Sequence, residues 1–447
     1  MMFVVLLALF VFFAVRAWFS PYTGLLGLLA ANIIQPGEIY PVFDTIRLER
    51  VMAVIVLVSA LRHREKLRFP PLTKGCLAFW GAIIIGVPFA WWVSGAMGFA
   101  IEFGKTMIYH VLIVSLLTTA ERFTKFIYMF TSLIGWTALS SATQYFSGNY
   151  VTNQGVDRAV GMTSIGGDPN TLGLTLACAL PLALLTAIKA TRLWKIAGAA
   201  VTVASVVTVV LTGSRMSFMA VAFFFAIYAA SRKRYYIYIP LALAVAGLVW
   251  ISLPTEYQER YSTVRSLEQD ISYQNRLVAW RGGWNMFKDN PLTGVGMGQF
   301  PNANGAKYWP GPGPRIWLNA HSLYLQLIAE LGFIGVIAFA AYLWAVLRTN
   351  FKLLPALRHR EDLPGVVRFF PAYSTFSILI LLFAGYSSHN LYRSTWYMLG
   401  ALTAALQLLA TERVQDTALA EEEHTAEESI RVLRPADVTP LCNTSVR

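Results

Sequence analysis

The sequence is poor in charged residues. Asp, Glu, Lys and Arg make up 13% of the 447 residues, whereas 56% are hydrophobic, and the apolar residues come in long uninterrupted blocks. A helix needs about 20 mostly apolar residues to cross the hydrocarbon core of a bilayer. Blocks of nearly that length recur from Met1 to about Ala410, so the sequence predicts one all-α polytopic membrane domain.

Other features that define common protein classes are also missing. The three cysteines, Cys76, Cys178 and Cys442, give neither a disulfide framework nor the spacing of a zinc site. The first apolar run has no basic region before it and no small-residue cleavage site after it, which favours a retained helix over a signal peptide. We expect no metal and no cofactor. The net charge of +12 is assigned to topology and anionic lipid rather than to nucleic acid.

A glycine-rich stretch, TGVGMGQF, is the nearest approach to a nucleotide-binding loop. Its glycines are Gly294, Gly296 and Gly298. A dinucleotide or phosphate loop would follow a strand or precede Lys-Ser/Thr, and neither is found here. The glycines therefore indicate close packing of the backbone against the membrane domain.

Basic residues set the expected topology. They cluster at residues 62–68, 189–195, 231–234 and 348–368, and the positive-inside rule places all four clusters in the cytoplasm. Counting one or two short helices before residue 46, we predict 12 or 13 helices. Those after it span residues 46–61, 75–93, 106–119, 125–146, 171–188, 196–211, 216–230, 235–252, 321–347, 369–386 and 392–410.

Three segments then fall on the outer, periplasmic face: residues 147–170, 211–217 and 253–320. The last is too long for a connector and is expected to be functional. Within it, Leu277, Trp280, Trp284 and Phe287 recur at helical spacing, which predicts an amphipathic helix along the membrane surface. Ser272 or Asp270 would cap its start, and Asn290-Pro291 would end it.

The domain organisation follows from this topology. Residues 1–410 form the membrane domain, with residues 253–320 as its large periplasmic loop. Residues 411–447, an acidic tail without an apolar face, are expected to be disordered and cytoplasmic.

Five basic residues from separate outer segments are candidates for a shared site. They are Arg158, Arg215, Arg276, Arg281 and His321. Arg215 is the most informative, because the positive-inside rule disfavours arginine in a short outer turn between two apolar helices. It either reaches the phosphate of outer-leaflet lipid or forms a dedicated anion clamp, for which the planar guanidinium is well suited.

His321 and Glu330 lie close together in LNAHSLYLQLIAELGFIG. His321 stands where a helix is expected to start, so it either caps the helix or accepts a proton from a hydroxyl near neutral pH. Glu330 would lie about 13 Å further along the helix, within the membrane and on the opposite face. We therefore expect Glu330 to be structural and paired with an arginine or with backbone groups.

The order of these motifs resembles the O-antigen ligase and polymerase family of bacterial membrane proteins. TGSR is followed by NRLVAW, NPLTGVGMGQF and AHSLYLQLIAELGFIG, and the resemblance spans residues 161–340. The first 150 residues are similar to the O-glycosylation ligases found with exosortase systems. His321 matches the family's histidine, and Arg215 and Arg276 match its arginines; Arg158 matches less closely, and Arg281 has no family counterpart.

The resemblance implies a metal-independent, inverting glycosyltransferase of the bacterial inner membrane. Such an enzyme moves a glycan from undecaprenyl diphosphate to an acceptor hydroxyl, on lipid A-core or on a protein Ser or Thr, at the periplasmic face. The arginines would bind the donor diphosphate and His321 would act on the acceptor.

Two other functions remain open at this point. A polymerase would join one lipid-linked glycan to another with the same donor handling. A transporter of polysaccharide or lipid would concentrate polar groups at the bilayer midplane and show internal repeats, whereas here the polar groups gather at one face.

Overall fold

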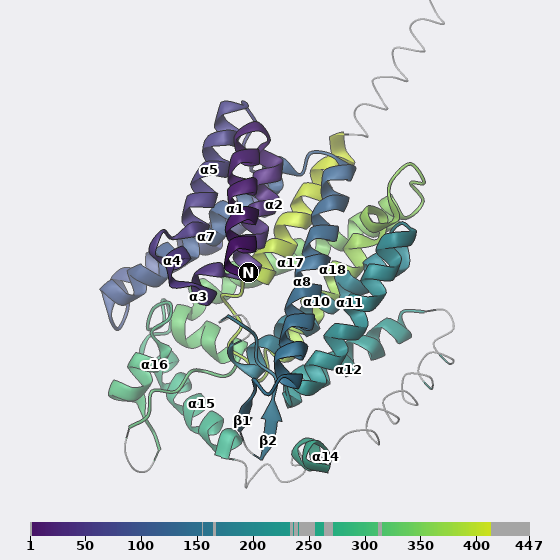
Figure 1. Ribbon diagram of the computed structural model, residues 1–447. Helices are drawn as coiled ribbons and strands as arrows, with labels where there is room; N and C mark the ends of the chain where they lie inside the picture. Colours follow the sequence, from purple (N-terminus) through teal and green to yellow (C-terminus); the bar gives the residue numbers. More distant parts are fainter. Residues whose placement is uncertain are drawn as a thin grey trace, which may run out of the picture.

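The structure is a computed structural model that describes residues 2–153, 155–163, 167–232, 236, 240, 255–262, 271–311 and 315–412. In this part of the chain the fold is a bundle of helices with one small hairpin, as the apolar blocks predict (Figure 1). The hairpin pairs β1 (Val151–Asn153) with β2 (Val156–Arg158) in antiparallel register, Val151 opposite Arg158.

Seven of the described helices are long and apolar enough to cross a membrane. They are α1 (Met2–Phe19), α6 (Pro71–Gly86, extended by the 3-10 turn η1, Val87–Phe89), α7 (Val93–Leu116), α10 (Pro169–Lys189), α11 (Arg192–Leu211), α17 (Leu323–Arg358) and α18 (Gly365–Ala384). The chain is therefore a multi-pass membrane protein.

Further helices complete the bundle and its extramembrane part. Those of the bundle are α2 (Pro21–Ile34), α5 (Leu48–Arg62), α8 (Ala120–Phe146), α12 (Arg215–Ala230) and residues 394–412. Shorter or peripheral ones are α3 (Pro36–Ile39), α4 (Pro41–Thr45), α14 (Thr255–Ser262), α15 (Ile271–Asp289), α16 (Phe300–Ala303) and the π-helix η3 (Asn304–Tyr308).

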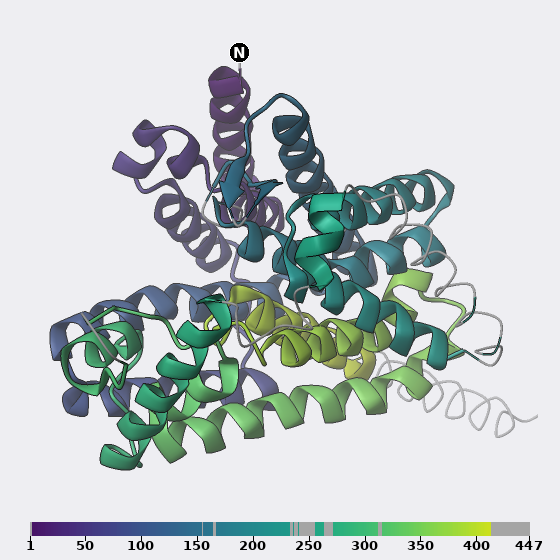
Figure 2. The same ribbon diagram turned by 90° about the horizontal axis from the view of Figure 1, so that it is seen from below.

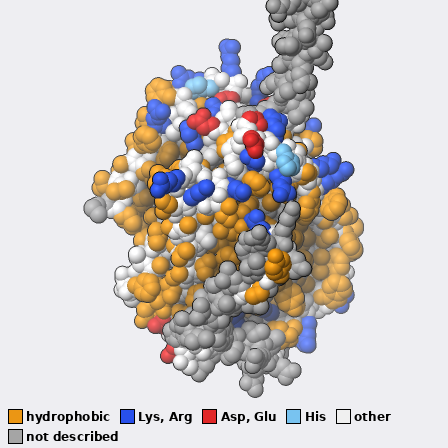
Figure 3. All heavy atoms as spheres, turned by 90° about the vertical axis from the view of Figure 1, so that its right-hand side faces the viewer, with side chains coloured by type: hydrophobic (Ala, Val, Ile, Leu, Met, Phe, Trp, Pro, Cys, Tyr) orange, Lys and Arg blue, Asp and Glu red, His pale blue; other side chains and the backbone are white. Residues whose placement is uncertain are grey.

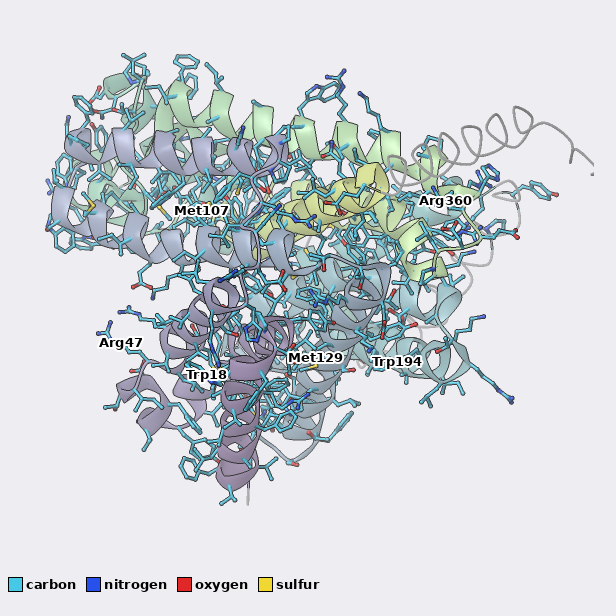
Figure 4. The ribbon with its side chains drawn as sticks, turned by 90° about the horizontal axis from the view of Figure 1, so that it is seen from above. Trp18, Arg47, Met107, Met129, Trp194 and Arg360 are labelled. Atoms are coloured by element: carbon cyan, nitrogen blue, oxygen red, sulfur yellow. The ribbon has the colours of Figure 1, made fainter. Side chains whose placement is uncertain are left out.

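The 36-residue helix α17 runs the length of the molecule. Seen from below, it extends from the α15–α16 region at one end to the α17–α18 turn at the other (Figure 2). Seen from above, Arg47 and Arg360 lie at opposite ends of the bundle (Figure 4). The hairpin, α14 and α15 lie in the lower part of Figure 1, which we call the loop end.

The opposite end collects the basic clusters. Arg68 forms an ion pair of 2.6 Å with Glu412, and Lys189 lies 4.0 Å over the ring of Phe369, so segments far apart in sequence meet there. In the space-filling view, lysine and arginine side chains gather in the upper part of the surface, with hydrophobic side chains below them (Figure 3). The structure thus brings the predicted cytoplasmic clusters together at one end.

A break in α17 joins this helix to the glycine-rich loop at residues 291–300. At Gly332 the backbone leaves helical geometry, with φ of 57°. The carbonyls of Ala329 and Glu330 accept hydrogen bonds from Val295 and Gly296. On the other side of the break, Phe333 and Ile334 donate to the carbonyls of residues 291 and 292. The loop therefore supplies the hydrogen bonds that the broken helix lacks.

The glycines of this loop fit spaces that no side chain could share. A Cβ at Gly294 would lie 2.3 Å from the carbonyl carbon of Glu330, and one at Gly296 would lie 2.4 Å from the Cβ of Ala90. Both residues have positive φ, as does Gly298. This confirms the prediction of close backbone packing and excludes any need for a nucleotide to explain the motif.

Several element boundaries differ from the prediction. Helix α7 begins at Val93 instead of residue 106, and α17 continues to Arg358, through part of the expected cytoplasmic loop. In the added part of α7, Glu102 forms ion pairs with Arg50 and Lys105, and the basic residues added to α17 lie toward its C-terminal end. The expected helix at 235–252 (apart from isolated residues), the cap at Asp270 and the acidic tail lie outside the described residues.

The contact between Gly294 and Glu330 can be tested with a matched pair of substitutions. Gly294 and Gly148 both have positive φ, but a Cβ at Gly148 would meet no atom within 4 Å. Gly148→Ala should cost about 1–2 kcal/mol from backbone strain alone. Gly294→Ala adds a clash with backbone and should lower the thermal unfolding midpoint in detergent much further. Equal midpoints for the two variants would contradict the insertion of the loop.

Candidate functional site

His321 stands two residues before α17, in a backbone conformation that is rare for its residue type. Its φ is +44°, in the left-handed region, which costs about 1–3 kcal/mol unless the surroundings impose it. They do so on both sides. The Ala320 carbonyl accepts a bond of 3.1 Å from Trp280 Nε1 of α15, and the Leu323 amide donates to the Gly385 carbonyl at 2.7 Å. These bonds fix the backbone on both sides of His321.

A second histidine, His389, packs against the first. The ring centroids of His321 and His389 lie 5.2 Å apart in an edge-to-face arrangement. The neighbouring Asn390 is buried and donates to the Leu381 carbonyl at 2.9 Å, which fixes the turn that carries His389. The side chain of His389 is exposed.

Sequence reasoning did not select His389. It lies in the short turn between α18 and the helix at 394–412. The argument that selected Arg215, a polar residue in a short turn between apolar helices, would have found it.

Both histidines are held in the neutral form. The pKa of His321 is lowered to about 4. Burial is the largest cause, the charges of His389 and Arg276 add to it, and the charge of Asp168 opposes it. Burial, followed by the charge of Arg393, lowers the pKa of His389. His321 is therefore unprotonated at neutral pH and can accept a proton. Its pKa lies well below the ordinary value of about 6.5 on which the sequence argument relied.

Asp168 belongs to the same group of charges and caps α10. Its carboxylate accepts from the Thr171 amide at 2.9 Å and from the Thr171 hydroxyl at 3.1 Å. Both histidines and Arg393 respond to its charge. The start of α10 thus places the carboxylate of Asp168 close to the two histidines and Arg393.

Arg158 forms part of the wall of this region. Its side chain is 4% exposed; Nε donates to the Thr212 carbonyl at 2.7 Å, and Nη2 donates to Asn170 Oδ1 at 2.9 Å. These bonds tie β2 to the turn before α12 and to the start of α10. In this geometry Arg158 positions its neighbours.

Arg215 is the first residue of α12 and is half-buried. The turn that carries it is tightly packed: Thr212, Ser214 and Ser217 are buried, and a Cβ at Gly173 of α10 would meet Ser217 Oγ at 2.6 Å. The turn therefore has little freedom, which suits a guanidinium that must be held in one orientation.

The two arginines of α15 have different surroundings. Arg276 is half-buried and lies within electrostatic range of His321. Arg281 is exposed, and five residues along an α-helix turn it about 140° away from Arg276. The structure thus joins Arg276 to His321 and directs Arg281 elsewhere.

Glu330 has a structural environment, as expected, but with different partners. It is 1% exposed and accepts from Tyr392 Oη at 2.7 Å, from the Phe300 amide at 3.2 Å and from Gln326 Nε2 at 3.4 Å. Of the two expected partners, arginine or backbone, the Phe300 amide confirms backbone, and the Tyr392 hydroxyl adds the shortest bond. Glu330 thereby links α17, the glycine-rich loop and the segment that carries His389 and Arg393.

The influence of Arg276 on His321 predicts a pH dependence. A protonated His321 cannot accept a proton, so kcat/KM should fall as pH falls through its pKa of about 4. Arg276 lowers that pKa; Arg276→Gln should therefore move the acidic limb of the profile to higher pH. The matched variant Arg281→Gln should leave the limb in place. A wild-type limb near pH 6.5, or equal shifts for both variants, would contradict the assignment.

Comparison with known proteins finds one similarity. Residues 173–340 match the sequence model of the O-antigen ligase family. The matched segment contains Arg215, Arg276, Arg281 and His321. No protein of curated function matches the sequence.

Proposed function

We propose that this protein is a member of the O-antigen ligase family and transfers a glycan from undecaprenyl diphosphate to an acceptor hydroxyl at the loop end of the bundle. The match to the family supports a glycosyltransferase that uses a polyprenyl-linked donor. The finer proposal depends on His321. This neutral histidine has a strained backbone and lies within electrostatic range of Arg276, just before α17 begins.

In this reaction His321 takes the proton of the acceptor hydroxyl. The acceptor oxygen then forms a bond to the anomeric carbon of the glycan, and the bond from that carbon to the diphosphate oxygen breaks. Because attack comes from the face opposite the leaving group, the anomeric configuration inverts. The electron pair leaves with undecaprenyl diphosphate.

The leaving diphosphate gains negative charge, which fixed cations must stabilise. Arg215 and Arg276 are the candidates, and hydrogen bonds to charged groups contribute about 1.5–3 kcal/mol each. Arg158, buried against Thr212 and Asn170, would hold the Arg215 turn in place. The proposal needs no metal and no cofactor.

The loop end is assigned to the periplasm by the positive-inside rule, since the basic clusters lie at the other end. This orientation supports our proposal that the protein is in the inner membrane and that its site faces the periplasm. A lipid A-core or a protein Ser or Thr would then be the acceptor; a second lipid-linked glycan would make the same enzyme a polymerase.

Removal of His321 tests the proton transfer. His321→Ala should lower the rate of glycan transfer about 10²–10⁴-fold, the usual contribution of a general base, while donor binding is retained. His359→Ala is the matched control, because His359 is exposed at the opposite end of α17. Transfer would be followed as release of undecaprenyl diphosphate by the purified protein with donor and acceptor. An active His321→Ala variant would rule out this role.

The same assay separates the two acceptor classes. Release that requires a lipid-core or protein acceptor identifies a ligase, and release with donor alone, yielding longer lipid-linked glycan, identifies a polymerase.

Arg215 tests whether the geometry of the cation matters in addition to its charge. Arg215→Lys keeps the charge and loses the planar fork that pairs with phosphate oxygens. We expect a fall in kcat/KM of about 10-fold or more. Arg192→Lys is the control, because Arg192 is also the first residue of a helix and lies exposed at the other end. An unimpaired Arg215→Lys variant would favour simple contact with outer-leaflet lipid.

A further inference from the structure

A cavity of about 370 Å³ lies beside the site, between α2, α7, α8, α10 and the start of the helix at 394–412. It is within the range of small-molecule sites, about 300–1,000 Å³. Its apolar walls come from these helices and include Leu29, Ile33, Phe130, Ile134, Ala179 and Met398.

The cavity extends from the loop end into the membrane domain. Thr171, Thr175 and Ala179 of α10 line one wall. Ala179 follows Thr171 by eight positions, which corresponds to a rise of about 12 Å along the helix. Thr171 is in the first turn of α10, next to Asp168. The polar end of the cavity therefore lies beside the proposed reaction site, and its apolar end lies at bilayer depth.

Arg393 lines the polar end of this cavity. Its guanidinium donates through Nη1 to Thr175 Oγ1 at 2.9 Å and through Nη2 to the Thr171 carbonyl at 3.3 Å. These bonds fix the guanidinium against α10. The next two residues, Ser394 and Thr395, also line the cavity and begin the helix at 394–412.

Arg393 has binding capacity to spare. A guanidinium carries five N–H donors, and these bonds leave the other three without a partner among the described residues. No carboxylate of the described chain forms an ion pair with it; the carboxylate of Asp168 accepts from Thr171 instead. Arg393 is partly exposed and lines the cavity, so its remaining donors can bind an anionic ligand there.

We propose that this cavity binds a lipid phosphate of the polyprenyl class, with Arg393 on the phosphoryl group and the first part of the isoprenoid chain along α10. The choice of a polyprenyl lipid rests on the proposed function. A phosphoryl group matches the fixed guanidinium, and the apolar walls match a hydrocarbon chain. Arg393 is outside the segment that matches the family.

The position of Arg393 also explains how the lipid would reach the reaction site. Arg393 lies within electrostatic range of His389, which packs against His321. A diphosphate whose lipid-side phosphate meets Arg393 therefore directs its other phosphate, which carries the glycan, toward His321 and Arg276.

Binding of undecaprenyl phosphate to the purified full-length chain, without acceptor or glycan, tests this inference. Arg393→Gln should weaken binding about 10-fold or more, whereas Arg360→Gln, at the other end of the bundle, should not. A second pair of variants probes the apolar wall. Ile33 is half-buried and lines the cavity; Ile33→Trp should reduce binding by filling the space, and Ile33→Ala should retain it.

Two further lipids identify the ligand. Undecaprenol, which lacks the phosphate, should bind more weakly than undecaprenyl phosphate and should be insensitive to Arg393→Gln. Phosphatidylglycerol should compete poorly. Equal competition by phosphatidylglycerol would assign the cavity to bilayer phospholipid and overturn the polyprenyl assignment.

Binding that is unchanged in both Arg393→Gln and Ile33→Trp would overturn the inference even if His321-dependent transfer were found. Conversely, Arg393-dependent binding without any transfer would support the cavity and count against the proposed reaction.

Discussion

The insertion of the glycine-rich loop into the break of α17 is the contact on which the site depends. At this break four backbone groups of the helix form hydrogen bonds with the loop. They are the carbonyls of Ala329 and Glu330 and the amides of Phe333 and Ile334. Unpaired backbone groups within a bilayer cost several kcal/mol each, so the loop and the helix stabilise one another. The extramembrane segment with Arg276 is thereby anchored to the helix that His321 precedes.

Glu330 extends this anchor to a third segment. A buried carboxylate is costly unless its oxygens are satisfied, and Tyr392 Oη is the shortest of its bonds at 2.7 Å. Tyr392 adjoins Arg393 and follows His389 by three residues. Glu330 therefore fixes the glycine-rich loop, which follows α15, relative to the turn that carries His389 and Arg393.

The charges around His321 and His389 follow from this arrangement. Arg276 acts on His321 and Arg393 acts on His389, and among the described residues the carboxylate of Asp168 acts on both histidines and on Arg393. Desolvation, followed by the neighbouring positive charges, lowers the pKa of both histidines and keeps them neutral. Binding a diphosphate would relieve the repulsion from these charges and raise the pKa of His321, so the donor itself would prepare the base for its task.

The membrane fold, the packing of the glycines and three candidate site residues could be predicted from the amino-acid sequence. Apolar blocks long enough to cross a bilayer have few alternatives to helices, and Arg215, Arg276 and His321 lie in recognisable local motifs. Tertiary structure alone decided the partners: Tyr392 for Glu330, His389 for His321, and α10 for Arg393. The partners in these pairs are between 62 and 222 residues apart, and local sequence does not encode which helices pack together. Tertiary structure also decided that Arg158 is buried against Thr212 and Asn170 while Arg281 is exposed. The exposure of a given residue type depends on how its neighbours pack.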